Sequence, residues 1–470
     1  THASNVTGDG NDIAQIGTLC EKYNLYFILD ASQTAGTAGI NMEQDHISAI
    51  CFTGHKGLFG PQGTGGIALA DGVCVKPLLS GGSGVHSFER KHPMELPAAL
   101  EAGTLNGHGI AGLHAALDWI KKTGIAAIHE KEMALAEQFQ RGIETIPGIH
   151  LYGGEKRVAA IVSCNLADLD SAYVSDCLAE DYGIATRAGV HCAPLMHTHF
   201  GTEKQGMVRF SFSCFNTTEE VEKAVRAMQD IAAENRGKVT AYVGAGGKTS
   251  SIRKRAETLR AEGKRVLILT TTKMMVPQEQ EIFAAYEQTG QESVISATAS
   301  VWQERRAAEK QLKERVQSVL DTYGCCVAGS LIPGTEKFGM LPEKLMEDLL
   351  YLADEILIEA DGSAHMPVKA PAEHEPVLFP YMDEVVIVMG AHAIGKPLQK
   401  VCHRVDYAKK ILKCDADKIV TAADIRALAE QGYAIPIQKQ FPWMKISKVT
   451  GKDIKLCLTA GKKDKVRDKQ

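Results

Sequence analysis

The chain has 470 residues, which is too long for one ordinary domain and predicts two or three. Its composition, 44% hydrophobic and 23% charged, is that of a globular protein, and a formal net charge of −5 gives no electrostatic reason to expect nucleic acid as a partner. No apolar run approaches about eighteen residues, so no membrane span is predicted. Twelve cysteines occur without a Cys-x-x-Cys pair or a signal peptide, which favours reduced thiols and a cytoplasmic location.

An acid and a lysine follow two predicted strands in the first part of the chain. The apolar run 25–29 has no helical period and ends at Asp30, which predicts a buried strand with a carboxylate at its end. A second β-rich run, 47–52, leads into a glycine-rich loop that contains Lys56. The ends of strands in an α/β sheet form the rim where small ligands bind. A Schiff-base lysine and an acid for a pyridinium nitrogen are what pyridoxal phosphate requires, although such a pair alone is more often structural or solvated.

The motifs around this pair make the assignment more specific. They are Asp-Ala-Ser-Gln at 30–33, Thr-Gly-His-Lys-Gly at 53–57 and Gly-Pro-Gln-Gly at 60–63. Together they resemble the class V aminotransferases and, within them, the cysteine desulfurases and selenocysteine lyases. The resemblance implies an α/β domain of the PLP-dependent transferase fold type I over residues 1–235.

The same resemblance implies a role for each polar residue of these motifs. Lys56 would form the Schiff base with pyridoxal 5'-phosphate, and Asp30 would pair with the ring nitrogen. Gln33 would face the phenolic oxygen of the cofactor. Thr53 and His55 would contact its phosphate.

Two further motifs extend the resemblance. The segment 1–8 is similar to a mid-domain motif in which Asn5 lies near cofactor and substrate. Because the family carries a phosphate loop and a ring-stacking residue ahead of that motif, we expect the chain to be an N-terminally incomplete fragment. The motif at 101–106 implies that Thr104 reaches the phosphate of a neighbouring subunit, which predicts a homodimer. From spacing alone, a Gly-Thr turn that caps the following helix is an equal alternative.

A candidate nucleophile lies in the Arg-Ala-Gly-Val-His-Cys-Ala-Pro motif at 187–194. Most cysteines are inert core residues, but the arginine and histidine beside Cys192 would stabilise a thiolate. The motif resembles the desulfurase loop whose cysteine takes sulfur from the substrate as a persulfide, which implies that role for Cys192. A zinc set of Cys192, His197 and His199 would lack an evident fourth ligand, so a metal is not favoured.

Arg209 is a lone charge inside the apolar strand predicted at 207–213. A buried arginine is rare unless it is paired, and a guanidinium matches a carboxylate with two parallel hydrogen bonds. The resemblance implies that Arg209 binds the substrate carboxylate, with a structural ion pair as the alternative. The other elements predicted in this half are helices at 12–24, 110–122, 125–146, 171–182 and 219–234, and a strand at 158–164.

After residue 237 a new pattern begins. A strand at 239–243 is followed by a tight glycine loop and a helix at 248–261. Loop amides, the helix amino end and a lysine together form a phosphate cradle. The standard phosphate loop has glycine where this chain has Tyr242, so the loop is a compact variant. The candidate nucleotide-binding residues are Gly244, Gly246, Gly247, Lys248 and Thr249.

An acid follows a later predicted strand, 355–358. Asp361 lies where a carboxylate could hold Mg²⁺ directly or through water, although it or Glu359 could simply cap a turn. The motifs GAGGKTS, TTTKM and EADGS resemble the YqeC family, accessory proteins of selenium-dependent molybdenum hydroxylases, over roughly 238–433. The resemblance implies a P-loop-like α/β nucleotide-binding domain, assigned to 238–470, that takes ATP or GTP with Mg²⁺.

The two resemblances give one functional hypothesis. The first half would be a PLP-dependent cysteine desulfurase or selenocysteine lyase that acts on L-cysteine or L-selenocysteine, releases alanine and passes sulfur or selenium to an acceptor protein. Lys56 would move the α proton, Arg209 would hold the carboxylate, and Cys192 would attack the sulfur. The second half would serve the maturation of selenium-dependent hydroxylases. The alternatives are another class V transaminase, or a nucleotide-binding maturation factor with an inert PLP-domain remnant.

Overall fold

The structure is a computed structural model that describes residues 1–85, 88–287, 299–450 and 454–456. The chain forms two compact units, Thr1–Ala232 and Ala233–Gln470. Both units combine helices with sheets, so the predicted α/β class is confirmed. Within the described ranges, no helix combines the length and the apolar character needed to cross a bilayer.

The first unit begins with a small sheet that brings Asp30 and the Lys56 loop to one edge. Its order is β1 (Ile28–Asp30), β2 (Ala49–Thr53) and β3 (Gly65–Leu69), and β1 and β2 are parallel with Asp30 opposite Cys51. Helix α1 (Ile13–Lys22) precedes β1 and is capped by Asp12, whose side chain accepts the Gln15 amide. Because β1 and β2 are parallel, their carboxyl ends lie side by side.

The predicted burial of the run before Asp30 is only half right. Phe27 and Leu29 are buried, whereas Tyr26 and Ile28 are 74% and 64% exposed. Strand β1 lies at the edge of the described sheet and packs one face against α1. Since successive side chains of a strand point to opposite faces, the alternation is that of a strand with one packed face.

A second, antiparallel sheet forms the rest of the unit, in the order β4 (Ile149–Tyr152), β5 (Ile161–Leu166) and β6 (Val208–Ser211). Every residue of β5 is buried, and Phe139 of the long helix packs on Phe210 of β6 with ring centroids 4.3 Å apart. The helices of this unit after α1 are α2 (Gly107–Thr123), α3 (Ile125–Ile143), α4 (Ser171–Tyr182), α5 (Pro194–Phe200) and α6 (Thr218–Asn235).

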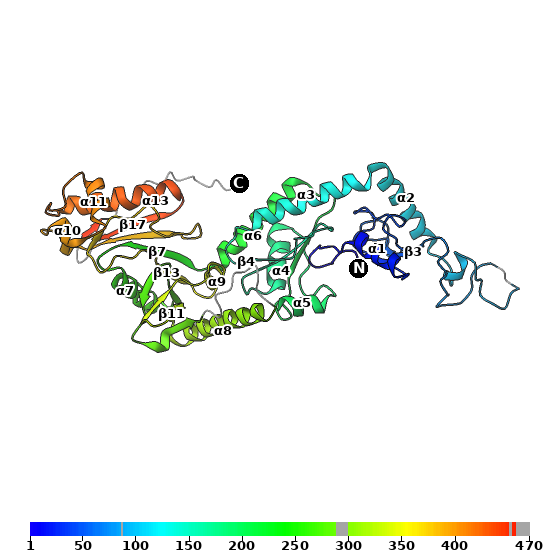
Figure 1. The fold of residues 1–470 in the computed structure, drawn as a ribbon, viewed down its shortest axis with the longest axis horizontal. Coiled ribbons are helices and arrows are strands. Elements are labelled where there is room, and N and C mark those ends of the chain that lie inside the picture. The colour runs from blue at the N-terminus through cyan, green and yellow to red at the C-terminus, as the bar shows by residue number, and fades with distance from the viewer. Residues whose placement is uncertain (86–87, 288–298, 451–453, 457–470) are drawn as a thin grey trace. The chain divides into compact units, whose positions relative to one another are not determined.

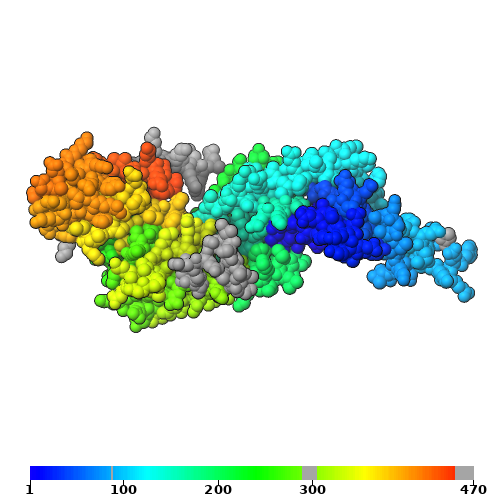
Figure 2. Space-filling model, viewed as in Figure 1, coloured from blue at the N-terminus to red at the C-terminus, as the bar shows by residue number. Residues whose placement is uncertain are grey.

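Between β3 and α2 the chain runs as a long segment that contains one short 3-10 helix, η1 (Ala98–Leu100). Leu78 is 95% exposed, and the segment extends away from the sheets of its own unit (Figures 1 and 2). Thr104 lies near the end of this segment and is exposed.

The first ten residues connect the two sheets of this unit. The His2 amide donates to the Asp30 carbonyl at 2.9 Å, at the end of β1. On the other side, the Ser163 hydroxyl of β5 donates to the Val6 carbonyl at 2.5 Å. Asn5 is therefore held between the Asp30 edge and the second sheet.

The second unit is built on one large twisted sheet whose centre is parallel. The central order is β17 (Lys445–Thr450), β15 (Glu384–Met389), β7 (Lys238–Gly244), β13 (Glu355–Glu359), β8 (Val266–Thr270) and β11 (Cys325–Leu331). Strand β10 (Phe283–Tyr286) adds to β11 in parallel, and short antiparallel strands lie at the edges: β9 (Lys273–Met275), β12 (Lys337–Gly339) and β18 (Ile454–Leu456). The central strands are almost continuously buried, as expected for a parallel sheet covered on both faces.

Helix α7 (Lys248–Ala261) covers one face of this sheet, where Ile252 and Leu259 pack on Tyr242 and Val386. The other face is covered by α8 (Ala299–Tyr323), α9 (Glu343–Leu349), α11 (Val405–Leu412), α12 (Ala422–Ala427), the π-helix η4 (Leu428–Ala434) and α13 (Ile435–Gln440). The remaining elements are η2 (Gln280–Ile282), η3 (Ala391–Ala393), α10 (Leu398–Val401) and the paired strands β14 (Val368–Lys369) and β16 (Cys402–His403). All carboxyl ends of the central strands share one edge, and the glycine loop between β7 and α7 lies there.

Candidate functional site

Asp30 and Lys56 lie at the carboxyl edge of the small sheet. The Asp30 carboxylate accepts the Ser32 amide at 3.0 Å. Hydrogen bonding by Ser32 lowers the pKa of Asp30, and the positive charge of Lys56 acts in the same direction. Both side chains are exposed, so an ionised carboxylate and a lysine face a ligand-accessible edge.

The loop that carries Lys56 is fixed against the segment after Asp30. A Cβ at Gly57 would come within 2.7 Å of the Ala35 carbonyl oxygen, so the tight approach of these two segments requires glycine. Thr53 Oγ1 and His55 Nδ1 are 2.7 Å apart, and Gln33 is half-buried one turn after Asp30. These residues, predicted from separate motifs, therefore belong to one edge.

Cys192 is exposed on the loop between α4 and α5, and its thiol is next to a guanidinium. Arg187 Nη2 lies 3.6 Å from Cys192 Sγ. His191 and Cys192 both have left-handed backbone, with φ of 53° and 57°. Two consecutive non-glycine residues in this region are strained, and such strain persists only where the surroundings hold it.

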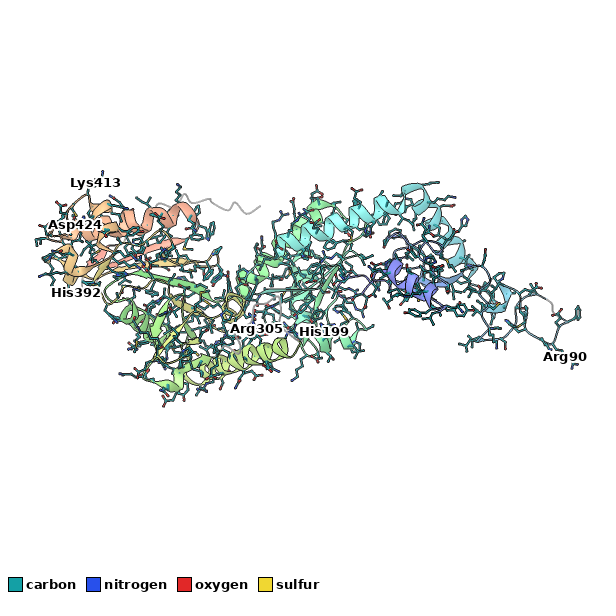
Figure 3. All side chains as sticks on the ribbon, in the orientation of Figure 1. Arg90, His199, Arg305, His392, Lys413 and Asp424 are labelled. Atoms are coloured by element: carbon teal, nitrogen blue, oxygen red, sulfur yellow. The ribbon has the colours of Figure 1, made fainter. Side chains whose placement is uncertain are left out.

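Buried histidines hold this loop. His191 Nε2 is 2.9 Å from the Arg187 carbonyl, and its Nδ1 is 3.5 Å from His197 Nε2. His197 is fully buried in α5 and pairs with the Thr202 hydroxyl at 2.9 Å. His199, on the same helix, is labelled in Figure 3. The sequence did not assign His197 and Thr202 to this support, because only the fold of the loop brings them behind His191.

Arg209 reaches the same place from β6. Its Nη1 donates to the Asn5 carbonyl at 2.9 Å, while its Nε is buried without a hydrogen-bond partner in the described chain. Burial lowers the pKa of the Arg209 guanidinium, and the charge of Arg187 adds to the shift, whereas Cys192 opposes it. None of the described ion pairs involves Arg209, so the structural ion pair considered as an alternative is not observed.

Asn5 joins these groups. Its side-chain amide donates to the His191 carbonyl at 2.6 Å, and its own carbonyl accepts Arg209. On the same segment, His2 Nδ1 is 2.9 Å from Thr34 Oγ1, directly after the Asp30 motif. One short segment therefore ties the Cys192 loop to the edge that carries Asp30 and Lys56.

Thr104 stands apart from these residues. It is exposed, and no hydrogen bond within the described ranges joins it to the Asp30 edge or to the Cys192 loop. The cap of α2 is Asn106, whose side chain accepts the Gly109 amide at 3.0 Å, so the helix-capping alternative for Thr104 is wrong. The contact of Thr104 with a neighbouring subunit stays a prediction.

In the second unit, the glycine loop has the backbone of a tight turn. Gly244, Gly246 and Gly247 have φ of 93°, 76° and 126°, values that other residues rarely adopt. Lys248, at the first position of α7, is only 4% exposed, and its Nζ donates to the Gly244 carbonyl at 2.7 Å. Burial lowers the pKa of Lys248, and the carboxylates of three nearby acids oppose this shift.

Two of these acids, Glu359 and Asp361, have different hydrogen-bond partners. Glu359 Oε2 accepts the Thr249 hydroxyl at 2.9 Å, and burial raises the pKa of Glu359 while Lys248 opposes. Asp361 is fully buried, and its Oδ2 accepts the Gly244 amide at 3.1 Å and the Tyr433 hydroxyl at 2.6 Å. Glu359 is therefore the acid beside the helix-start hydroxyl, whereas Asp361 braces the loop.

The other oxygen of Asp361, Oδ1, pairs with Lys369. Magnesium ligation by Asp361 stays a prediction. In the described residues, no three His, Cys, Asp or Glu side chains form a metal-binding group. Lys369 is fully buried and also contacts Glu375 at 2.8 Å, and Glu375 pairs with Arg404 at 2.9 Å. Lys369, Arg404 and the two carboxylates thus form one network of ion pairs next to the glycine loop.

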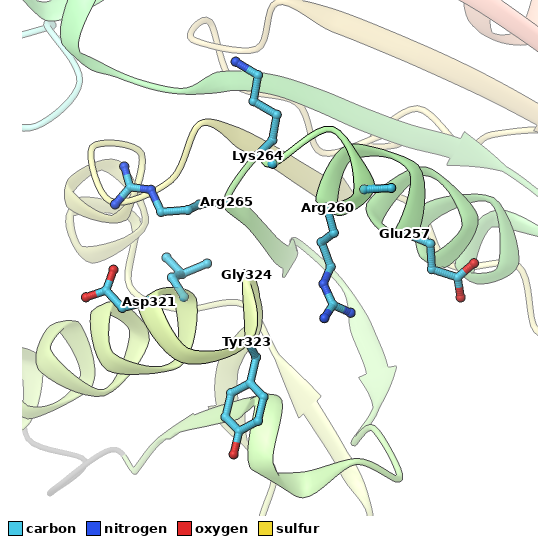
Figure 4. A pocket seen from close by; sticks show the side chains of 10 residues that line it. Glu257, Arg260, Lys264, Arg265, Asp321, Tyr323 and Gly324 are labelled. Carbon is cyan, nitrogen blue, oxygen red and sulfur yellow. The ribbon is translucent and has the colours of Figure 1, made fainter.

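A separate hollow of about 640 Å³ lies at the amino ends of β8 and β11 (Figure 4). Arg260, Lys264 and Arg265 line it together with Asp321 and Tyr323. It is at the edge of the sheet opposite the glycine loop. Since ligands of open parallel sheets bind at the carboxyl ends of the strands, this hollow is not the candidate site.

Two family models match this chain. Residues 1–224 match the family model "Aminotransferase class-V", and residues 240–406 match the model "YqeC protein". The two resemblances stated from the motifs are therefore confirmed.

Several similar proteins are cysteine desulfurases by name. A "Probable cysteine desulfurase" of Methanothermobacter thermautotrophicus is 33% identical over 237 residues, which are 49% of this chain and 59% of that protein. A "Cysteine desulfurase" of Shigella flexneri is 31% identical over 236 residues, 49% and 57% of the two chains. The apo structure of a cysteine desulfurase from Thermococcus onnurineus is 30% identical, with a TM-score of 0.46 over 50% of this chain and 59% of the other. The chain thus spans less than two thirds of the length of the relatives it matches.

Proposed function

We propose that residues 1–235 form the Lys56 and Cys192 part of a PLP-dependent cysteine desulfurase or selenocysteine lyase. We further propose that residues 238–470 form a nucleotide-binding domain that serves the maturation of selenium-dependent molybdenum hydroxylases. The observation that carries the first proposal is the meeting of a thiol, two guanidiniums and Asn5 on a loop tied to the Asp30 edge.

The residues at the Asp30 edge fit pyridoxal phosphate. Bound there, the cofactor would supply an electron sink for the α carbon of an amino acid. Asp30, held ionised by Ser32, is suited to keep a proton on the ring nitrogen. Lys56 would hold the cofactor covalently, and its amine would be the group that moves the α proton. Thr53 and His55 would offer hydrogen-bonding groups to the phosphate, and Gln33 would face the ring oxygen.

Arg209 suits an α-carboxylate. The Arg209 guanidinium is buried beside a second arginine, its Nε is unpaired, and it has no acidic partner among the described residues. Burying such a charge costs free energy unless an anion binds to it. L-cysteine would supply that anion and would place its sulfur towards Cys192. Asn5 keeps the two groups in register by bonding to both the loop and the arginine.

Cys192 then acts as the nucleophile. Its thiolate attacks the substrate sulfur, the S–S bond forms as the C–S bond breaks, and alanine leaves while a persulfide remains on Cys192 for an acceptor protein. With L-selenocysteine, the C–Se bond would break with its electron pair left on Cβ, which takes up a proton to give alanine, and selenium would leave as Se(0) without attack by the thiol. We also propose a homodimer in which Thr104 reaches the cofactor phosphate of the neighbouring subunit.

For the second half, the order strand, glycine loop, Lys248 and helix supports the binding of ATP or GTP with Mg²⁺. A lysine at a helix start opposes the helix dipole, and this conflict is removed when an anion lies between its ammonium group and the loop amides. Thr249 and Glu359 lie beside that position, where their oxygens would face the Mg²⁺ that accompanies the phosphates.

The cofactor proposal is tested by borohydride reduction of the protein loaded with pyridoxal phosphate. We expect one labelled peptide, containing Lys56, and loss of the label in Lys56→Ala. Label on Lys91, an exposed lysine of the loop before α2, in place of Lys56 would contradict the assignment. Failure to bind the cofactor at all would favour the alternative of a nucleotide-binding factor with an inert first half.

A further inference from the structure

A second cavity of the second unit lies near the glycine loop. It has a volume of about 270 Å³ and lies between the carboxyl ends of β15 and β17 and the turn from α12 into η4. Apolar side chains of β15 and of the helical segment line the cavity, together with polar side chains that include Glu430, Gln431 and Lys448. The lining residues are Ile387, Met389, Ile425, Arg426, Ala427, Ala429, Glu430, Gln431, Lys448 and Val449.

The cavity and the glycine loop share strand β15. The Ala245 amide of the loop donates to the Val388 carbonyl at 2.8 Å. The residues on either side of Val388, Ile387 and Met389, line the cavity. Val388 packs with α7, whereas Ile387 and Met389 point to the opposite face of β15, so the cavity lies on the other face of the sheet from α7, at the strand end that holds the loop.

A chain of hydrogen bonds also connects them. One wall of the cavity is the π-helix η4, a rare geometry that is frequent at functional sites. Tyr433 on this helix is buried and donates to Asp361, which accepts the Gly244 amide of the loop. The wall of the cavity is thus fixed relative to the phosphate-binding loop through two hydrogen bonds.

We propose that this cavity binds the base of the nucleotide whose phosphates the glycine loop binds. This inference rests on the nucleotide-binding function proposed above and adds the position of the base. The alanines and the β15 side chains offer a narrow apolar space for a flat ring, as ligand pockets generally do. Gln431, Lys448 and Glu430 supply donors and acceptors for the ring edge, and the last two form an ion pair at the rim.

The test separates the base from the phosphates. Ala427 lines the cavity and is half-buried, so Ala427→Phe fills the space from its edge. Ala423 is exposed on the same helix outside the cavity lining, and Ala423→Phe is the matched control. Calorimetry on the full chain with Mg²⁺ measures the affinity for ATP, GTP and inorganic tripolyphosphate.

We expect Ala427→Phe to weaken binding of the preferred nucleotide by at least about 10-fold and to leave tripolyphosphate affinity unchanged, whereas Ala423→Phe changes neither. Lys248→Ala should weaken the binding of both the nucleotide and tripolyphosphate. Unchanged nucleotide affinity in folded Ala427→Phe would overturn the base site and leave the phosphate site intact. Absence of both nucleotide and tripolyphosphate binding in the wild type would overturn the proposed function itself. Ala427→Leu adds a smaller side chain, so we expect a smaller loss of nucleotide affinity. It replaces Ala427→Phe as the test variant if phenylalanine disturbs α12.

Discussion

The two units arrange their charged groups in opposite ways. In the first, Asp30, Lys56 and Cys192 are exposed at loop and strand ends. In the second, Lys248, Asp361 and Lys369 are nearly or fully buried at the strand ends. The exposed groups are accessible to a substrate, whereas the buried groups form hydrogen bonds and ion pairs with one another and with the glycine loop. The difference teaches that the first set is placed where a ligand can reach it, whereas the second set mainly holds the glycine loop in shape.

The largest expected effect tests the chemical half of this comparison. Cys192→Ala should reduce sulfide release from L-cysteine by at least about 100-fold, because the attacking group of the reaction is removed. Cofactor absorbance and the thermal midpoint should not change, since Cys192 is exposed. Cys74→Ala, at another exposed cysteine, is the matched control. Undiminished sulfide release would show that Cys192 is only a loop residue, and turnover that requires a keto acid would favour a transaminase.

The next effect tests the structural half. Lys369→Met leaves the buried carboxylate of Asp361 without its cation, while the half-buried Glu375 keeps Arg404, and we expect the free energy of unfolding of the second unit to fall by about 3–5 kcal/mol. The control is Lys344→Met, whose 2.9 Å pair with Glu347 is largely exposed on the lysine side and is expected to cost at most about 1 kcal/mol. Urea unfolding measures both. Equal losses in the two variants would contradict the structural role of Lys369.

A buried acid in the first unit sharpens the contrast, because it lacks the paired cations of the second. Burial raises the pKa of Glu132 from 4.5 to about 7, although its carboxylate accepts the Cys214 amide at 3.0 Å. A pKa raised on folding means that the native state binds the proton more tightly. This contribution, on the order of 3 kcal/mol, is therefore fully present below pH 4.5 and is lost as the pH rises through about 7.

Glu132→Gln should remove this pH dependence, since the amide keeps the oxygen that accepts Cys214 but has no proton to lose. Denaturant unfolding at several pH values between 4 and 8 measures the difference. The same slope in the variant and the wild type would assign the pH dependence to other groups.

The smallest expected effect concerns Lys248, which is buried yet proposed to meet a ligand. Lys248→Ala should weaken nucleotide binding by about 10-fold or more, as the loss of a charge-assisted contact of about 1.5–3 kcal/mol implies. Lys254→Ala, at an exposed lysine of the same helix, should have little effect. If the two variants bind nucleotide equally well, Lys248 belongs with the purely structural charges of this unit.

Local pattern determined much of the secondary structure. The helices Ser171–Tyr182 and Lys248–Ala261 have the predicted bounds. Asp170 caps the first of these helices and Gly183 ends it in a left-handed turn, so both signals lie within a few residues of the element. Residues this close in the chain interact in almost any fold that contains the helix, which is why sequence suffices for them.

Only the tertiary structure decided which side chains meet. The Asn5 contact with His191 joins residues 186 positions apart, and the Tyr433 contact with Asp361 joins residues 72 positions apart. The sequence also predicted a fully buried strand before Asp30, whereas only one face of that run is buried. An apolar run by itself cannot distinguish a strand with two packed faces from a strand with one. Motifs named the candidate residues one by one. Their distances, burial and partners depend on how distant segments pack, and no local spacing carries that information.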